Sequence, residues 1–192
     1  MERESLLSGQ AFLVRGFMSA RDCEEQIDLA EELGFDEAPI NMGAAAVVMK
    51  DFRDNSRVIS DDPELAAALF PRLCPYLPDQ IGGREVAGLN ERFRYYRYDL
   101  GEKFAPHYDG SFRRNDDEES ELTFMVYLND DFEGGSTDFY HPDHSLRLSV
   151  RPEQGMALVF LHPLFHAGTP VKNGRKYVLR TDVMYARRRF SL

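Results

Sequence analysis

The sequence His107-Tyr108-Asp109 decides how the fold of this chain is interpreted. Successive side chains of a β-strand point to opposite faces of a sheet, so residues two positions apart lie on the same face. In a strand, His107 and Asp109 can therefore reach one metal ion together while Tyr108 points away. A single His-x-Asp sequence is common by chance, and its meaning depends on the rest of the chain.

A second histidine and a lysine occur later in the chain, in the run Leu164-Phe165-His166-Ala167-Gly168-Thr169-Pro170-Val171-Lys172-Asn173-Gly174-Arg175-Lys176-Tyr177. Together with His107 and Asp109, His166 completes a set of three ligands that can occupy one face of an octahedral ion and leave other positions open. This set is typical of non-heme Fe(II) oxygenases, although ligand affinity alone would also allow Cu, Ni or Zn to bind. The sequence therefore predicts a metal site and does not by itself identify the metal.

The same run resembles the closing segment of the prolyl 4-hydroxylase branch of the Fe(II)/2-oxoglutarate dioxygenases. In that branch a distal metal-binding histidine is followed by a Pro-Val pair, a glycine turn and a basic residue. The resemblance extends from Arg94 to Tyr185, roughly half of the chain. It includes three further segments in the family's order: Phe104-Ala105-Pro106, Gly134-Gly135-Ser136-Thr137-Asp138-Phe139 and Pro152-Glu153-Gln154-Gly155-Met156-Ala157-Leu158-Val159-Phe160.

The resemblance implies a catalytic centre in which His107, Asp109 and His166 bind Fe(II). It also implies that O₂ and 2-oxoglutarate are co-substrates and that ascorbate can serve as a reductant. In the family, a basic residue at the position of Lys176 holds the far carboxylate of 2-oxoglutarate. A tyrosine at the position of Tyr98 hydrogen-bonds the same carboxylate.

Lys176 is expected inside the fold, where an unpaired charge is costly and a carboxylate partner is needed. In a 2-oxoglutarate site the ligand itself is that partner. Two alternatives remain: Lys176 extends to solvent from a strand end, or Arg175 takes its role if the register differs by one residue. Arg180 lies on the Lys176 face and is predicted to bind the co-substrate or contact the substrate. Its alternative role is a structural ion pair with Asp182 or another acid.

A candidate substrate site lies on the strand before the His-x-Asp sequence. Arg92, Arg94 and Tyr96 share one face of that strand with Tyr98. The planar guanidinium group suits carboxylate or phosphate, so two arginines directed into a barrel would recognise an anion. The alternative is that both arginines lie over the strand and pair with surface acids.

The predicted architecture is an α+β fold: a double-stranded β-helix (a jelly roll, cupin-like) with N-terminal helices packed on it. We expect one domain over residues 1–192, with a mainly helical N-terminal layer at 1–84 and the jelly-roll core at 85–192. One helix should begin after Ser19 and end at Gly34, and another should begin at Asp62-Pro63 and end before Pro75. Short strands separated by turn residues are predicted at 12–17, 87–98, 103–109, 121–128, 136–140, 145–150, 156–161 and 175–185.

Composition limits the classes of partner. A formal net charge of -10 disfavours general binding to nucleic acid, which needs a basic surface. No segment of signal-peptide type and no stretch of membrane-spanning length is present in the sequence, so no membrane association is expected. Cys23 and Cys74 are the only cysteines, and two thiols are more consistent with a reducing compartment than with a disulfide framework. We therefore expect a cytoplasmic protein.

Three other features favour ordinary structural roles. His141-Pro142-Asp143-His144 resembles a metal cluster but is predicted to be a hairpin turn, because Asp and Pro favour turns. His162 lies four residues before His166, yet Pro163 makes a helical histidine pair improbable. The acidic run Asp116-Asp117-Glu118-Glu119 is expected in a solvated loop that is a candidate lid and would repel acidic substrates.

The leading functional hypothesis is an Fe(II)- and 2-oxoglutarate-dependent dioxygenase that hydroxylates an aliphatic C–H bond, releasing succinate and CO₂. A prolyl residue in a protein or peptide is the first candidate substrate, and a free amino acid or other small molecule is the alternative. A zinc hydrolase on the same scaffold would not explain Lys176. A binding module without turnover should lack a ligand, and none of the three is missing. Residues 35–60 and 110–120, which would select the substrate, carry no motif.

Overall fold

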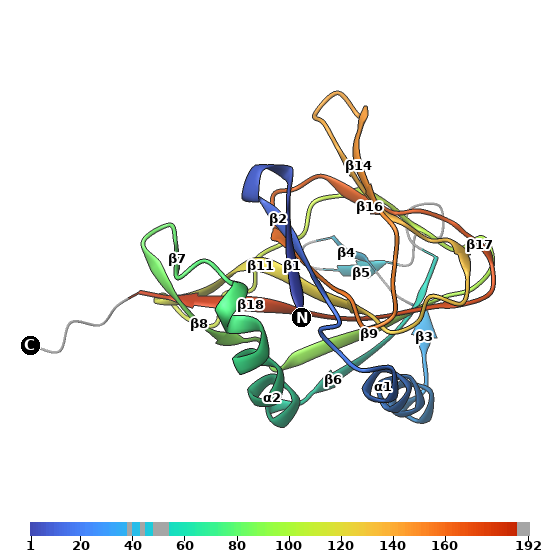
Figure 1. Ribbon diagram of the computed structural model, residues 1–192, viewed down its shortest axis with the longest axis horizontal. Helices are drawn as coiled ribbons and strands as arrows, with labels where there is room; N and C mark the ends of the chain where they lie inside the picture. The colour runs from blue at the N-terminus through green and yellow to red at the C-terminus, as the bar shows by residue number, and fades with distance from the viewer. Residues whose placement is uncertain (38–39, 43–44, 48–53, 188–192) are drawn as a thin grey trace, which may run out of the picture.

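The computed structural model describes residues 1–37, 40–42, 45–47 and 54–187. Antiparallel pairing accounts for every strand pair within this part of the chain, and two sheets carry most of the structure (Figure 1). The larger sheet has ten strands, eight of which follow one path in the order β1 (Glu2–Leu6), β2 (Ala11–Arg15), β15 (Ala157–Leu161), β11 (Glu118–Tyr127), β18 (Lys176–Ala186), β9 (Arg92–Tyr98), β6 (Ser56–Asp61), β3 (Asp36–Glu37). The other two are β8 (Arg84–Leu89), which pairs with β18, and β7 (Gln80–Ile81), which pairs with β8.

The smaller sheet has four strands in the order β10 (Phe104–His107), β16 (His166–Gly168), β13 (Thr137–Tyr140), β14 (Leu146–Val150). Two short ribbons complete the strands of the described residues: β12 (Glu133–Gly134) with β17 (Val171–Asn173), and β4 (Ile40–Met42) with β5 (Ala45–Val47). In this sheet β13 and β14 form a hairpin, whereas the adjacent pairs β10 with β16 and β16 with β13 are far apart in sequence. The small sheet therefore forms only when the loops after β10 and β15 bring these strands together.

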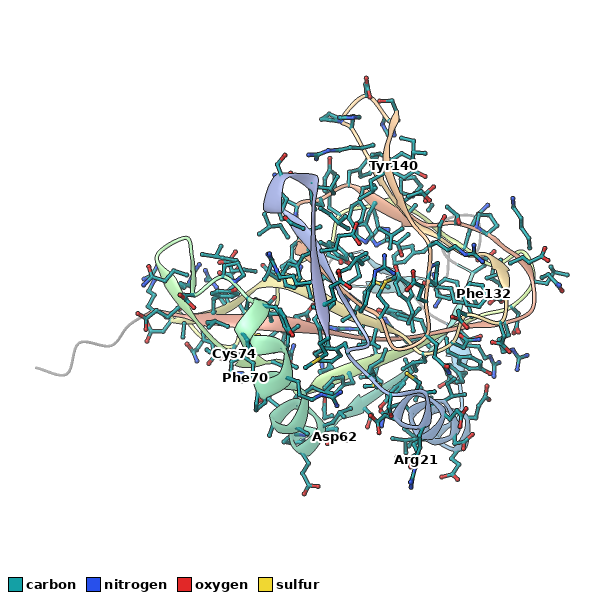
Figure 2. The ribbon with its side chains drawn as sticks, in the orientation of Figure 1. Arg21, Asp62, Phe70, Cys74, Phe132 and Tyr140 are labelled. Atoms are coloured by element: carbon teal, nitrogen blue, oxygen red, sulfur yellow. The ribbon has the colours of Figure 1, made fainter. Side chains whose placement is uncertain are left out.

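Two α-helices lie on the same side of the large sheet: α1 (Ala20–Leu33) and α2 (Pro63–Leu73) (Figure 1). Ser19 and Asp22 form the predicted capping box at the start of α1, and Gly34 follows its last residue. The Asp62 side chain accepts a hydrogen bond from the backbone N–H of Leu65 and caps α2, which begins at Pro63 (Figure 2). Two 3₁₀ turns, η1 (Leu7–Gly9) and η2 (Cys74–Tyr76), follow β1 and α2. Within the described residues, no helix is long and apolar enough to cross a membrane.

The two faces of the large sheet support two separate apolar clusters. One cluster joins the helices to the sheet and includes Cys23 and Ala30 of α1 and Leu69 of α2. The other lies between the two sheets and joins Phe139 of β13 to Phe160 of β15, whose rings meet edge to face at 5.3 Å between centroids. Alternation along each strand separates the clusters. The polar residues that point between the sheets are consequently surrounded by an apolar wall.

The sequence predicted both helices and most of the C-terminal strands, and the jelly-roll expectation agrees with two sheets packed face to face. The expectation of a mainly helical layer at 1–84 was incomplete. This part also contributes β1, β2, β3, β6 and β7 to the large sheet. The strand β6 was missed because its two apolar residues, Val58 and Ile59, are adjacent, so the sequence shows no alternation. Part of the segment 35–60 lies outside the described residues.

Gly155 links the helical layer to the sheet and predicts a stability effect. Its φ is +74°, its backbone carbonyl accepts a hydrogen bond from the Met18 N–H, and a Cβ there would lie 2.1 Å from the Met18 carbonyl oxygen. Gly34 has φ +82° and no heavy atom within 4 Å of such a Cβ. We expect Gly34→Ala to cost only the backbone strain, about 1–3 kcal/mol of unfolding free energy. Gly155→Ala should cost about 1–3 kcal/mol more because of the clash. Urea unfolding measures both, and equal losses would contradict this account.

Candidate metal and co-substrate site

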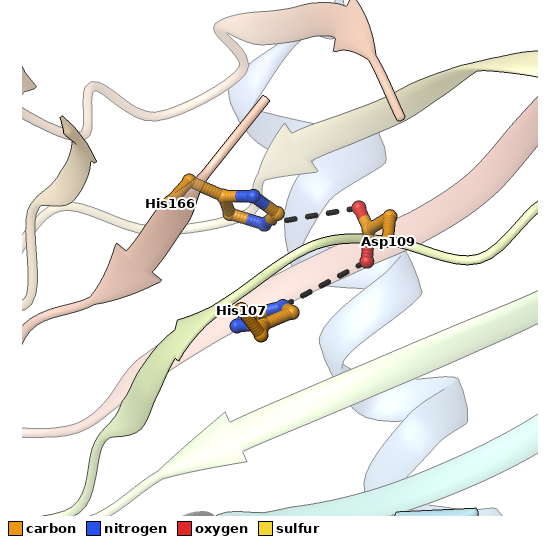
Figure 3. A group of neighbouring side chains, drawn as sticks. All are labelled: His107, Asp109 and His166. Atoms are coloured by element: carbon orange, nitrogen blue, oxygen red, sulfur yellow. Dashed lines mark ion pairs between the residues drawn. The ribbon is translucent and has the colours of Figure 1, made fainter. Parts of the chain in front are cut away.

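A cross-strand histidine pair forms the centre of the site. Strands β10 and β16 are antiparallel, and His107 lies directly opposite His166, with 4.3 Å between the ring centroids. Asp109 lies two residues beyond the end of β10, where its backbone N–H donates to the His162 carbonyl at 3.3 Å. The three side chains point toward one another (Figure 3), and one ligand atom from each lies within 4.8 Å of the others. The expectation that Asp109 continues the strand was wrong, but its side chain still reaches the same point.

Backbone carbonyls orient both imidazole rings. The Nδ1 atom of His107 lies 2.8 Å from the Ala105 carbonyl oxygen, and Nδ1 of His166 lies 2.8 Å from that of Leu164. A carbonyl only accepts, so each Nδ1 carries the proton and each Nε2 keeps its lone pair. Both Nε2 atoms face Asp109, at 3.7 Å from Oδ1 for His107 and 3.7 Å from Oδ2 for His166.

The electrostatics of the three groups suit a divalent cation. Burial, with a further contribution from His166, lowers the pKa of His107 to about 3, and burial also lowers the pKa of His166. Burial alone would raise the pKa of Asp109. The Arg180 guanidinium, the two imidazoles and a hydrogen bond from Thr123 outweigh burial and hold that pKa below its usual value. At neutral pH the site therefore presents two neutral imidazoles and one carboxylate, a donor set that fits Fe(II) with open coordination positions.

A hydrogen-bonded chain fixes the Asp109 carboxylate. The Thr123 hydroxyl donates to Oδ2 at 2.6 Å, and Arg180 Nη2 lies 3.1 Å from Oδ1. His162 lies behind Thr123, with its Nδ1 3.1 Å from the Thr123 hydroxyl and its Nε2 2.9 Å from the Ser120 hydroxyl. Sequence reasoning excluded a helical pairing of His162 and did not find this role. The available signal was weak: Thr123 is a polar residue within the apolar run from Leu122 to Tyr127 that ends β11.

A buried lysine lies at the other end of the same cavity. Lys176, Tyr98 and Gly168 line it together with the three candidate ligands, and Lys176 lies four strand residues along β18 from Arg180, which contacts Asp109. The Lys176 Nζ donates to the Gly135 carbonyl at 2.6 Å and lies 5.1 Å from the centre of the Tyr98 ring. Its side chain is buried, so the alternative in which Lys176 extends to solvent was wrong. Burial lowers the pKa of Lys176 to about 7, and no carboxylate of the described residues lies within ion-pair distance of it.

The two neighbouring arginines do not lie at the Lys176 end. Arg175 points to the surface, where its Nε lies 2.5 Å from Asp99 Oδ1, so the alternative with a shifted register was wrong. Arg180 Nη2 lies between Asp109 and Asp182, 3.2 Å from Asp182 Oδ1. The ion pair proposed as the alternative role of Arg180 is confirmed. Its predicted contact with the co-substrate carboxylate held by Lys176 does not follow from this position.

The predicted substrate residues lie on one face of β9, as expected from strand alternation. Tyr96 lines the cavity together with Tyr98. Arg94 Nη1 lies 3.3 Å from Asp182 Oδ2, and Arg92 makes two hydrogen bonds to Asp61 at the rim. Both arginines are thus paired with acids, which was the alternative interpretation, and both also line a groove outside the cavity. Their role in substrate binding stays a prediction.

The turn predicted at 141–144 is confirmed. It joins β13 to β14, and His144 has a positive φ of 65°. The acidic run is not simply a solvated loop. Glu118 and Glu119 begin β11 and form ion pairs with Arg114 and Arg84, so only Asp116 and Asp117 precede the strand. These pairs leave little support for a mobile lid at 116–119.

Comparison with known proteins agrees with this geometry. Residues 93–181 match the model of the 2OG-Fe(II) oxygenase superfamily. Prolyl 4-hydroxylase 13 of Arabidopsis thaliana is 26% identical over 195 residues, covering 88% of this chain and 69% of the relative. A probable prolyl 4-hydroxylase 3 of the same plant is 26% identical over 199 residues, covering 88% of this chain and 67% of the relative.

Two solved structures show the shared fold. The viral collagen prolyl hydroxylase of Paramecium Bursaria Chlorella virus-1, in its 2OG complex, superposes with a TM-score of 0.64 at 22% identity, covering 93% of this chain and 97% of that one. A prolyl hydroxylase from Trichoplax adhaerens, in complex with a hypoxia inducible factor peptide fragment, gives a TM-score of 0.71 at 16% identity. The match covers 92% of this chain and 84% of that one. Such neighbours have a double-stranded β-helix core, which confirms the predicted fold class.

The family match and the relatives support one conclusion, with which the fold and the assembled His-His-Asp triad agree. The match over residues 93–181 and the prolyl 4-hydroxylase relatives support a 2OG-Fe(II) oxygenase of the prolyl 4-hydroxylase-like branch, and this family implies a dioxygenase that uses Fe(II) and 2-oxoglutarate.

Proposed function

We propose that this enzyme hydroxylates a prolyl residue in a peptide or protein, with His107, Asp109 and His166 as the Fe(II) ligands. One observation carries the proposal: a single cavity has three convergent metal ligands at one end and a buried lysine at the other. The relatives that cover most of the chain are prolyl 4-hydroxylases, which supports the prolyl substrate.

Lys176 and Tyr98 are proposed to hold the far carboxylate of 2-oxoglutarate. A buried ammonium whose hydrogen bond goes to a neutral carbonyl, Gly135 O, gains most when an anion arrives. The Tyr98 side chain is buried beside it. Bound Fe(II) and 2-oxoglutarate supply the O₂-dependent oxidation of a C–H bond, with succinate and CO₂ as products. The protein contributes the fixed ligands, the ammonium and an apolar wall that excludes water.

Two alternatives are weaker. A zinc hydrolase would use the same three ligands but has no use for Lys176 at the far end of the cavity. A free amino acid is the alternative substrate, but the groove outside the cavity, of about 490 Å³, is large enough for a longer chain. We also propose a cytoplasmic location, because Cys23 and Cys74 are both free thiols.

The metal ligands can be tested without turnover. Anaerobic addition of Fe(II) and then 2-oxoglutarate to the metal-free protein should produce a visible charge-transfer band that needs both additions. His166→Ala should abolish the band, and Asp109→Ala should abolish succinate formation, because each removes one of three ligands. His141→Ala, in the exposed β13–β14 turn, is the matched control and should behave as the unmodified protein. Tight metal binding without a band would reject the dioxygenase site.

The role of Lys176 predicts a large loss of co-substrate affinity. Truncating one partner of a buried charge pair costs about 2–5 kcal/mol, so Lys176→Met should raise the Kd of 2-oxoglutarate at least about 30-fold. Arg175→Gln removes the same charge from the adjacent position, where the side chain binds Asp99 on the surface, and should leave the Kd unchanged. Calorimetric titration in the presence of Mn(II) gives both values. A larger effect in Arg175→Gln would reverse the assignment.

The same lysine predicts a pH dependence. The ligand-free pKa of Lys176 is about 7, and only the ammonium attracts the carboxylate, so binding raises this pKa. The affinity for 2-oxoglutarate should therefore be constant below pH about 7 and fall by up to roughly tenfold per pH unit above it. Binding at pH 8 should take up a proton, detectable by titration in two buffers of different ionisation enthalpy. Proton uptake that persists in Lys176→Met would assign it to another group.

A further inference from the structure

The groove outside the cavity leads directly to the metal ligands. It has a volume of about 490 Å³, and its lining includes His107, Asp109 and Arg180, which also line the cavity. A chain bound in the groove would therefore place one residue at the open side of the metal site. The chemistry of that chain can be inferred from the groove, provided that the proposed function holds.

Two guanidinium groups face each other across the floor of the groove. Arg94 of β9 and Arg180 of β18 are directly paired residues of neighbouring strands. Like charges in this arrangement destabilise a sheet unless an anion lies between them. Asp182 is that anion: its Oδ2 lies 3.3 Å from Arg94 Nη1 and its Oδ1 lies 3.2 Å from Arg180 Nη2. One carboxylate, which is only 2% exposed, is shared by two cations.

The second carboxylate near Arg180 belongs to Asp109, a proposed metal ligand. Asp109 Oδ1 lies 3.1 Å from Arg180 Nη2, but a metal-bound Asp109 shares its charge with the cation. The pair Arg94 and Arg180 then keeps one full counter-charge within ion-pair distance of both, that of Asp182. A protein with a net charge of -10 thus carries a local positive surface beside its metal site, and such a local reversal of charge selects an anionic ligand.

Aromatic side chains lie next to these cations. Tyr96, Phe104, Tyr108 and Phe112 line the same groove, and Tyr108 is 58% exposed. Flat apolar surfaces suit the ring of a prolyl residue. None of the four residues of the acidic run 116–119 is among the residues that line the groove. Glu118 and Glu119 are paired with Arg114 and Arg84.

We propose that the groove binds an acidic peptide, in which an Asp or Glu carboxylate close to the hydroxylated proline pairs with Arg94 and Arg180. The short distance between Arg180 and the metal ligand Asp109 determines how far the acidic residue can lie from the proline in the peptide. Arg180 lies in contact with Asp109, and one extended residue spans about 3.3 Å, so the acidic side chain belongs within one or two positions of the proline.

Binding measurements test this directly. Fluorescent peptides of equal length, each with one proline flanked on both sides by Glu, Gln or Lys, are titrated with protein loaded with Mn(II) and 2-oxoglutarate. We expect the Glu peptide to bind about tenfold more tightly than the Gln peptide and the Lys peptide to bind more weakly still. The preference for Glu should decline as salt concentration rises. With Fe(II) and O₂, the same order should appear in the KM for succinate formation.

Two variants of β9 separate the groove from the overall charge. Arg94→Gln should remove most of the preference for Glu over Gln peptides. Arg97→Gln removes the same charge from the opposite face of β9, where Arg97 pairs with Glu31, and should keep the full preference. The peptide series on the unmodified protein does not depend on either variant, so an unstable variant cannot obscure the result.

The contrary outcomes are distinct. Equal affinity for the three peptides, with the Fe(II)–2-oxoglutarate band still present, would overturn the acidic-peptide inference and leave the proposed dioxygenase site intact. Absence of the band would reject the proposed function itself. Free glutamate or free proline that competes with the Glu peptide at a similar Kd would assign the carboxylate to a small molecule and would also overturn the peptide inference.

Discussion

The antiparallel pairing of β10 with β16 is the constraint on which the site depends. It places His107 and His166 opposite each other although they are far apart in the chain. The backbone carbonyls of Ala105 and Leu164, each two residues before its histidine, then fix both rings in the same tautomer. The relative position of the two histidine ligands therefore depends on the register between β10 and β16. A shift of one residue would turn one histidine to the other face of the small sheet.

Charge balance explains why the remaining polar residues are present. Burial penalises the Asp109 carboxylate, and the favourable contacts from Thr123 and Arg180 keep it ionised. Arg180 in turn needs Asp182, which also neutralises Arg94. The charged side chains from Asp109 to Arg94 thus form a series in which each one neutralises its neighbour, and the series extends from the metal site to the groove. Lys176 differs, because its hydrogen bond goes to a neutral backbone oxygen, and this is what makes it a receptor for an anionic ligand.

Most of the fold was predictable from local patterns, and the ligand triad was predictable from the His-x-Asp spacing together with the family resemblance of the later run that contains His166. Alternation in strands, the Ser19 cap and the His-x-Asp spacing are readable over a few residues. The roles of Thr123 and His162 were not predictable, since β11 and the loop before β16 meet only through tertiary structure. The same holds for Arg180: alternation placed it correctly on the face of Lys176 and Asp182, but whether it faced co-substrate or metal ligand depended on its neighbours. The strand β6 was missed because its apolar residues Val58 and Ile59 are adjacent and give its short sequence no period of two.

Strand β18 connects the co-substrate end to the substrate groove. Every second residue of β18 from Lys176 to Asp182 lies on the same face of the strand. Lys176, Val178 and Arg180 line the cavity, and Asp182, the next residue on that face, lines the groove. Four residues of strand span about 13 Å, so the distance from the ammonium that would hold 2-oxoglutarate to the guanidinium beside the metal ligand is set by the backbone. A rigid strand at the centre of the large sheet, paired with both β11 and β9, keeps this distance constant. Changes in substrate preference are then possible through groove residues such as Arg94, on the neighbouring strand, without moving the metal or co-substrate positions.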